Sequence, residues 1–153
     1  CTWQVGDVYA YRLESEYSRE KGFYGKYIIF QKVGETECWP GHIIPIVVVY
    51  RWIGAEIPRM EELRKLEFLN QIRPVSLMGR TQEECYHREL VCESEKKIPV
   101  TQLILLGNQK PREKTVLKKG RCNCMGWEKT KINWTIEKET IDLYLAWQEH
   151  DNA

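Results

Sequence analysis

The most reactive side chains of this sequence are cysteines and histidines, and two pairs of them lie close together along the chain. Cys38 precedes His42 by four residues, and Cys85 precedes His87 by two. A thiol beside an imidazole can act as a nucleophile, because the imidazole takes the thiol proton. On a strand, Cys85 and His87 would share a face, but an ordinary thiol at a solvated strand end explains the same spacing. We therefore expect no catalytic residue here.

The cysteines have three interpretations, which are free thiols, a metal site or disulfides. Cys122 and Cys124 are separated by one residue, whereas the cysteines of metal sites prefer wider spacing. A chain of 153 residues is long enough to bury a core without disulfide staples. We expect reduced thiols, no metal and no cofactor. The six positions are Cys1, Cys38, Cys85, Cys92, Cys122 and Cys124.

Reduced thiols favour a cytoplasmic location, because disulfides persist in oxidising compartments. No charged and then apolar segment opens the sequence, so we expect no secretory leader in it. The longest apolar run, residues 43–50, contains Pro45 and is too short to cross a bilayer. Because the first residue is Cys1 rather than Met, we expect that an upstream stretch or a tag has been lost.

Paired carboxylates are the remaining candidates for acid–base chemistry. Glu83 and Glu84 are adjacent, and Glu89, Glu93 and Glu95 follow them. Such groups can act as a general acid and a general base, but a solvated strand face and a charged turn explain them equally well. The sequence has no Gly-rich phosphate loop, no serine elbow and no two-histidine metal motif. We predict that the protein is not an enzyme.

Charge is balanced over the whole chain but segregated near its end. There are 23 Lys and Arg and 22 Asp and Glu, a balance that excludes a histone-like coat on nucleic acid. Residues 109–131 carry eight basic and two acidic residues, whereas residues 135–151 carry five acidic residues and one basic. The basic segment could follow a phosphate backbone or be a solvated loop. The acidic segment could dock on it or face a basic enzyme.

The chain is rich in tryptophan and tyrosine, with six and eight residues respectively. Aromatic side chains build both cores and recognition surfaces. Three of the tryptophans fall in patterned elements and are expected in the core, namely Trp3, Trp134 and Trp147. The other three lie in loops or at strand ends, and we predict that they contact a partner, packing in the core being the alternative. These are Trp39, Trp52 and Trp127.

The elements that must position these groups are mainly strands. Period-two patterns bounded by Gly, Pro and polar turns predict strands at about 7–14, 26–33, 42–53, 72–76, 86–92, 100–106 and 132–134. The links between the first three strands are short, which favours antiparallel pairing. Pro45 within the third strand suggests a bulge or an edge.

Two helices are expected beside these strands. Pro58 and the acidic pair that follows predict a helix at 58–69, and Thr135 can cap a helix at 136–149. The apolar face of the second helix should dock on the sheet, and it contains Ile136, Leu143, Tyr144 and Trp147. We expect one α+β domain over residues 1–153, with a mainly antiparallel, strongly twisted sheet that is open or barrel-like, one mid-chain helix and one C-terminal helix.

The opening of the chain matches a family pattern. It reads Trp3-Gln4-Val5-Gly6-Asp7-Val8-Tyr9-Ala10-Tyr11-Arg12-Leu13, and Gly22-Phe23-Tyr24-Gly25-Lys26-Tyr27 follows as a turn and a second strand. This aromatic-x-x-Gly-Asp-(Ile/Val)-aromatic strand resembles the opening of the immunity protein 26 family, over about residues 1–55. Beyond these residues only the order of elements matches. The Gly-Asp strand is also a little similar to small barrel toxins that cleave messenger RNA, but the rest of their pattern is absent.

The resemblance implies a cytoplasmic antidote from a bacterial polymorphic toxin system, which binds its cognate toxin and blocks it without catalysis. The alternative is a nucleic-acid-associated module that uses the basic segment 109–131, through Lys118, Lys119 and Arg121. No membrane partner is expected. The residues that we predict to contact the toxin are Trp39, Trp52, Trp127, Glu137, Glu139, Asp142, Glu149 and Asp151.

Overall fold

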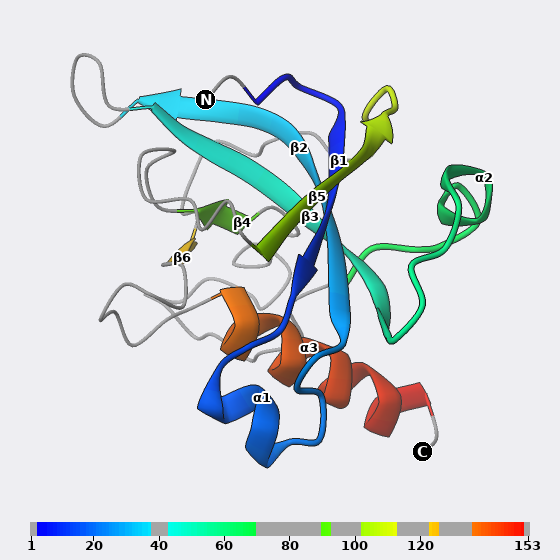
Figure 1. Ribbon diagram of the computed structural model, residues 1–153. Helices are drawn as coiled ribbons and strands as arrows, with labels where there is room; N and C mark the ends of the chain where they lie inside the picture. The colour runs from blue at the N-terminus through cyan, green and yellow to red at the C-terminus, as the bar shows by residue number, and fades with distance from the viewer. Residues whose placement is uncertain are drawn as a thin grey trace.

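A computed structural model describes residues 3–37, 43–69, 90–92, 102–112, 123–125 and 136–151 (Figure 1). The elements in chain order are β1 (Asp7–Arg12), α1 (Glu16–Glu20), β2 (Tyr27–Glu37), β3 (Ile43–Gly54), α2 (Met60–Leu63), β4 (Leu90–Cys92), β5 (Leu103–Asn108), β6 (Asn123–Met125) and α3 (Ile136–Asp151). The described strands form one sheet in the order β5-β1-β2-β3-β4-β6. All pairs are antiparallel except β4 with β6. The predicted α+β class and antiparallel sheet are confirmed.

The sheet is open rather than barrel-like. Within the part of the chain that the structure describes, β5 and β6 are the two edges of the sheet. Of the two predicted alternatives, an open sheet or a barrel, the described strands form the open sheet. The β2–β3 pair is long and curved (Figure 1). Its register shifts twice, between Ile28 and Phe30 and between Lys32 and Gly34. Such bulges increase the local right-handed twist, which explains the curvature.

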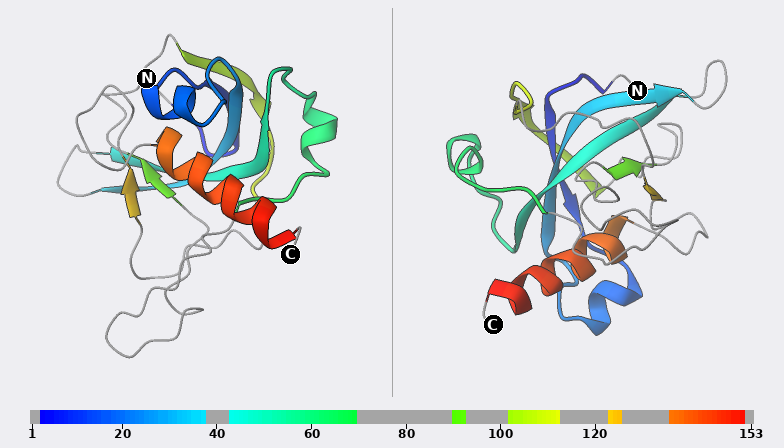
Figure 2. Two further views of the ribbon diagram at one scale, coloured as in Figure 1. Left: turned by 90° about the horizontal axis from the view of Figure 1, so that it is seen from below. Right: turned by 180° about the vertical axis from the view of Figure 1, so that it is seen from behind.

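Both faces of the sheet carry buried side chains. The α3 core lies on the face that α3 crosses (Figure 2), and it includes Tyr9, Tyr11, Ile28, Phe30, Val47, Val49, Ile136, Ile141 and Leu143. The α2 core lies on the other face and consists of Val8, Ala10, Ile29, Val48, Tyr50, Leu63 and Phe68. Because successive residues of a strand point to opposite faces, burial on both sides makes β1 and β3 almost continuously apolar.

The C-terminal helix agrees closely with the prediction of 136–149. It spans Ile136–Asp151 and packs against the α3 core. Ile136 and Leu143 are buried, and Tyr144 and Trp147 pack beside them partly exposed, as the apolar face predicted. No helix in the described ranges is both long and apolar enough to cross a membrane.

The mid-chain helix is much shorter than the predicted 58–69. It spans Met60–Leu63, and the chain then runs back beside β3, where Phe68 forms an isolated antiparallel bridge with Tyr50. Strand β4 pairs with β3 only near Ile46, so the backbone groups of β3 around Tyr50 need another partner. Pairing with β3 therefore outweighs helix formation over the second half of the predicted helix.

A helix that the sequence patterns did not predict precedes Gly22. Helix α1 spans Glu16–Glu20 and begins at Ser15, whose hydroxyl accepts a hydrogen bond from the backbone N–H of Ser18 at 3.0 Å. Gly22 follows it at φ +82°. A capping serine and a terminal glycine are start and stop signals, but five residues are too few for an apolar period.

The later strands differ in their bounds from the prediction. Strand β5 spans Leu103–Asn108, so it starts later and ends two residues later than the predicted strand 100–106. Strand β6 falls within the polar stretch 107–126, where no strand was expected. Of the predicted strand 86–92, residues 90–92 are confirmed as β4. The predicted strands at 72–76 and 132–134 lie outside the described residues.

Candidate functional site

The Gly-Asp motif that carries the family resemblance is part of the internal framework. Asp7 is 8% exposed, and its carboxylate accepts hydrogen bonds from the backbone N–H of Gln4 at 2.9 Å and from Asn108 Nδ2 at 2.9 Å. Gly6 has φ +98°, and its carbonyl accepts a hydrogen bond from the backbone N–H of Gln109. The motif thus joins the start of β1 to the end of β5, and its Asp7 side chain is buried in this junction.

Two of the acidic residues predicted to contact a toxin are buried instead. Glu137 is 0% exposed and Glu139 is 3% exposed. The Glu137 carboxylate accepts hydrogen bonds from the backbone N–H groups of Glu14 (2.8 Å) and Ser15 (2.9 Å) and from the Tyr11 hydroxyl (3.2 Å). The expectation that Glu137 and Glu139 are surface charges is therefore wrong, because α3 turns its first turn toward β1 and α1.

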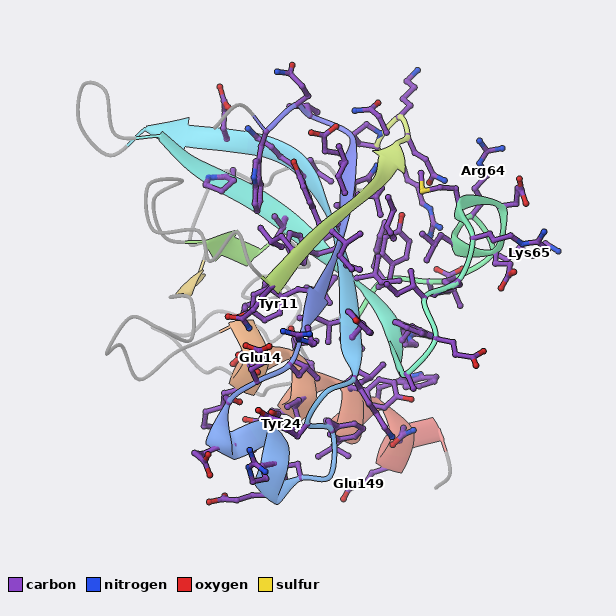
Figure 3. All side chains as sticks on the ribbon, in the orientation of Figure 1. Tyr11, Glu14, Tyr24, Arg64, Lys65 and Glu149 are labelled. Atoms are coloured by element: carbon purple, nitrogen blue, oxygen red, sulfur yellow. The ribbon has the colours of Figure 1, made fainter. Side chains whose placement is uncertain are left out.

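The rest of the acidic segment has one exposed carboxylate among the described side chains. Asp142 is half-buried and accepts hydrogen bonds from the Tyr17 hydroxyl and from Lys138 Nζ. Glu149 is exposed near the end of α3 (Figure 3), and the side chain of Asp151 lies outside the described set. The predicted acidic surface is thus reduced to the neighbourhood of Glu149.

The described tryptophans contribute to packing. Trp3 is 5% exposed and stacks on Tyr9 at 4.6 Å between ring centroids, and Trp147 packs partly exposed against the α3 core. Trp52, a predicted contact, is half-buried against the α2 core, with its ring over Gly54. Packing against the α2 core thus explains the half-buried position of Trp52.

Many of the residues singled out in the sequence lie outside the described ranges. They are Trp39, Trp127, Trp134, Lys118, Lys119, Arg121, the two thiol–imidazole pairs and the carboxylates from Glu83 to Glu95. In the ranges that are described, no three His, Cys, Asp or Glu side chains gather as they would around a metal ion.

The edge strand β5 exposes large apolar side chains. Ile104 is 43% exposed and Leu105 is 58% exposed. They are opposite Ala10 and Tyr9 of β1, and Val5, which is 48% exposed, lies at the far end of β5, where Asn108 Nδ2 donates to its carbonyl. The sequence shows only an apolar run here. This run becomes an edge strand of the sheet because it pairs with β1, a strand that is distant along the chain.

A polar cavity lies at the end of β5, on the same side of the sheet as the α2 core. Its volume is about 400 Å³, and it is open to solvent. The lining residues come from β2, β3, the residue after α2 and the segment after β5, and they are Gln31, Tyr50, Arg64, Asn108, Gln109, Lys110 and Arg112. Of these described lining residues, three are cations and none is a carboxylate. Figure 3 shows Arg64 next to Lys65 at the end of α2.

Hydrogen bonds hold the walls of this cavity. Gln31 Nε2 donates to the carbonyl of Gln109 at 2.7 Å, and Gln109 Nε2 donates to the carbonyl of Met60 at 3.1 Å. Arg112 Nη2 donates to the carbonyls of Leu63 and Arg64, at 3.3 and 3.2 Å. The segment after β5 is therefore attached both to the sheet and to α2, which fixes the three cations around one space.

Tyr50 is one of two almost fully buried residues among the described cavity lining, at 1% exposed. Burial raises the pKa of its hydroxyl above the ordinary 10.0, and the nearby Arg112 guanidinium partly opposes this by lowering it. The hydroxyl is therefore protonated at neutral pH and can donate a hydrogen bond.

The raised pKa predicts a pH dependence of stability. The folded state holds the Tyr50 proton more tightly than the unfolded state does. The contribution of Tyr50 to the free energy of unfolding is therefore complete below pH 10, and it is lost as the pH rises through the pKa of the folded state. Urea unfolding between pH 8 and pH 11 should show a loss of stability that is smaller in Tyr50→Phe. Tyr24→Phe, at a tyrosine that is 46% exposed, is the matched control and should keep the wild-type slope. An identical pH dependence of stability in the wild type and in Tyr50→Phe would contradict the raised pKa of Tyr50.

Comparison of the chain with models of known protein families, with characterised proteins and with solved structures finds no match.

Proposed function

We propose that the protein is a non-enzymatic binding protein of the immunity type, which blocks a cognate bacterial toxin by docking it along the edge of β5. The exposure of Ile104 and Leu105 carries this proposal. Among the described strands, β5 pairs only with β1, so its outer side presents backbone N–H and C=O groups beside two exposed apolar side chains.

An exposed apolar edge strand is an uncommon feature of a protein that has no partner. Proteins usually protect such edges with charges, bulges or a covering segment, because an open edge pairs readily with other chains. The β1–β5 pair has one register shift, where Val8 is opposite Gly107 and Tyr9 opposite Leu105. Regular pairing geometry is thus confined to the part of β5 that carries Ile104 and Leu105, which limits docking to a short extended segment of the toxin.

The mode of recognition that fits this edge is strand addition. The backbone of an added strand supplies hydrogen bonds, and alternate side chains supply specificity. Ile104 lies on the α2-core side of the sheet and Leu105 on the α3-core side, because they are opposite Ala10 and Tyr9. An added strand would therefore meet one apolar side chain on each face.

The immunity role rests on the resemblance of residues 3–13 and on a preformed surface. Strand β1, which supports β5, is buried along Asp7–Tyr11, so the edge is held on a rigid element. Rigid surfaces bind without an ordering cost, as a tight inhibitor requires. With Glu137 and Glu139 buried, apolar contact rather than charge steering dominates this proposal.

Replacing Leu105 with Lys should weaken toxin binding by about 2 kcal/mol, mainly through faster dissociation, because a central apolar contact is replaced by a charge. The toxin is identified as the product of the gene next to this one, and binding is measured by surface plasmon resonance. Tyr24→Lys, at a comparably exposed aromatic residue outside the sheet, should bind like the wild type.

Three results would contradict this proposal. One is wild-type toxin binding by Leu105→Lys. Another is a wild-type dimer that Leu105→Lys converts to a monomer, which would assign the edge to a second copy of the chain. The third is salt-dependent binding of RNA at physiological salt, which would favour the nucleic-acid alternative on segment 109–131.

A further inference from the structure

We propose that the cavity at the end of β5 binds a small phosphorylated molecule. This inference concerns residues other than the exposed edge, and it goes beyond the proposed toxin binding. Its first support is the charge of the described lining, in which Arg64, Lys110 and Arg112 border a space of about 400 Å³ and no described residue contributes a carboxylate. Three cations that converge on one space repel one another, and a bound anion relieves this repulsion.

Among the described residues, no acid neutralises Arg64 or Lys110. Glu62 on α2 is the closest acid in sequence to Arg64, and its carboxylate contacts Arg59 Nε at 3.2 Å. In the described part of the chain, no ion pair involves Arg64 or Lys110. The α2 carbonyls of Leu63 and Arg64 accept hydrogen bonds from Arg112, so the negative end of this short helix is covered by that guanidinium.

The second support is a tyrosine hydroxyl on the cavity wall. Tyr50 is 1% exposed, and the structure shows no hydrogen bond for its hydroxyl with any described residue. Because Tyr50 lines the cavity, its hydroxyl can donate a hydrogen bond to a ligand oxygen there. The phenol is a donor at neutral pH, which suits a phosphate oxygen.

The third support is an acceptor in the same cavity. Gln31 is 1% exposed, and its amide nitrogen donates both to the carbonyl of Gly6 at 3.2 Å and to that of Gln109 at 2.7 Å. The amide oxygen of Gln31 is therefore the group that remains to receive a donor from a ligand. A phosphate group alone is a poor donor at neutral pH, whereas a sugar phosphate also carries hydroxyl groups.

The size of the cavity restricts the ligand further. Small-molecule pockets are roughly 300–1,000 Å³ in volume, and this cavity is at the lower end of that range. An Arg or Lys cluster binds phosphate through charge-assisted hydrogen bonds, and a wall that is already fixed costs little to order on binding. A small sugar phosphate matches the positive charge of the lining and fits the volume of the cavity. It can also accept a hydrogen bond from the Tyr50 hydroxyl and donate one to the Gln31 amide oxygen.

The test uses two probes, inorganic phosphate and ribose 5-phosphate, titrated into the protein by isothermal calorimetry. We expect saturable binding with dissociation constants in the millimolar range or below, on the order expected for a few charge-assisted hydrogen bonds. Ribose 5-phosphate should bind about tenfold more tightly, because its hydroxyl groups can donate to Gln31. Equal affinities would instead identify free phosphate as the ligand of the same anion site.

Three variants and a control locate the binding. Lys110→Gln and Arg64→Gln should each weaken binding of ribose 5-phosphate about tenfold, since each removes one charge-assisted contact. Tyr50→Phe should weaken it by a smaller factor while keeping the ring contact with Phe68. Lys65→Gln, one residue after Arg64 and outside the lining, should bind like the wild type. Thermal unfolding of each variant confirms that it is folded.

The proposal is overturned if neither probe binds saturably, or if Lys65→Gln weakens binding as much as Lys110→Gln. It is also overturned if ribose without phosphate binds as well as ribose 5-phosphate. Tight binding of an RNA oligomer that Lys110→Gln abolishes would assign the cavity to nucleic acid instead. None of these variants changes Ile104 or Leu105, so the toxin-binding proposal stands or falls separately.

Discussion

Replacing Glu137 with Ala should lower the free energy of unfolding by about 3–5 kcal/mol. The carboxylate is fully buried and accepts hydrogen bonds from the backbone N–H groups of Glu14 and Ser15 and from the Tyr11 hydroxyl. Alanine would leave these buried donors without this acceptor, and each unsatisfied donor costs about 1–3 kcal/mol. Urea unfolding followed by the fluorescence of the six tryptophans measures the change.

Two further variants separate hydrogen bonding from helix effects. Glu137→Gln keeps an oxygen that can accept from both backbone N–H groups, so it should lose less than half as much stability as Glu137→Ala. Lys138→Ala changes the next residue of the same helix turn, whose side chain is exposed, and should change stability by less than about 1 kcal/mol. A loss below about 1 kcal/mol in Glu137→Ala would show that α3 is not held by this carboxylate.

Replacing Gly6 with Ala should lower the free energy of unfolding by about 2–4 kcal/mol. Gly6 has φ +98°, and a Cβ atom there would lie 2.6 Å from the carbonyl oxygen of Gln109. The backbone of Gly6 also donates to the carbonyl of Lys32 at 2.8 Å, so the turn cannot move away without breaking its link to β2. Urea unfolding measures the loss.

Matched glycines isolate the steric part of this effect. Gly22 and Gly25 have φ +82° and +81°, and a Cβ atom at either would meet nothing within 4 Å. Gly22→Ala and Gly25→Ala should therefore cost only the conformational penalty of about 1 kcal/mol. If Gly6→Ala costs no more than these two, the close approach of Gln109 does not constrain the motif.

Elements with long, strong patterns could be predicted from the sequence. Strands β1 to β3 and helix α3 have apolar patterns over many residues, and their positions agree with the prediction. Helix α1 was missed because five residues carry no period, and α2 was overestimated because Phe68 pairs with β3 instead of continuing the helix. A capping residue thus determines where α1 forms, and a tertiary contact determines where α2 ends. Helix propensity alone shows neither.

The candidate sites could be predicted only in part. The basic segment 109–131 was recognised, and its first two cations, Lys110 and Arg112, do line the polar cavity. Two of the other lining residues, Gln31 and Tyr50, are ordinary strand residues whose convergence depends on the order of the strands. The burial of Glu137 likewise could not be predicted from the sequence, because its hydrogen-bond partners lie more than 120 residues earlier in the chain.

The attachment of α3 to β1 and α1 has a consequence for biosynthesis. Strands β1, β2 and β3 can form a local meander early, but the face that carries Tyr11, Phe30 and Val49 is completed only by α3. A ribosome synthesises α3 after the other described elements, so the emerging chain exposes this apolar face until α3 has been made. Closure over such a long separation also slows folding, which lengthens the time for which this apolar face needs protection by chaperones.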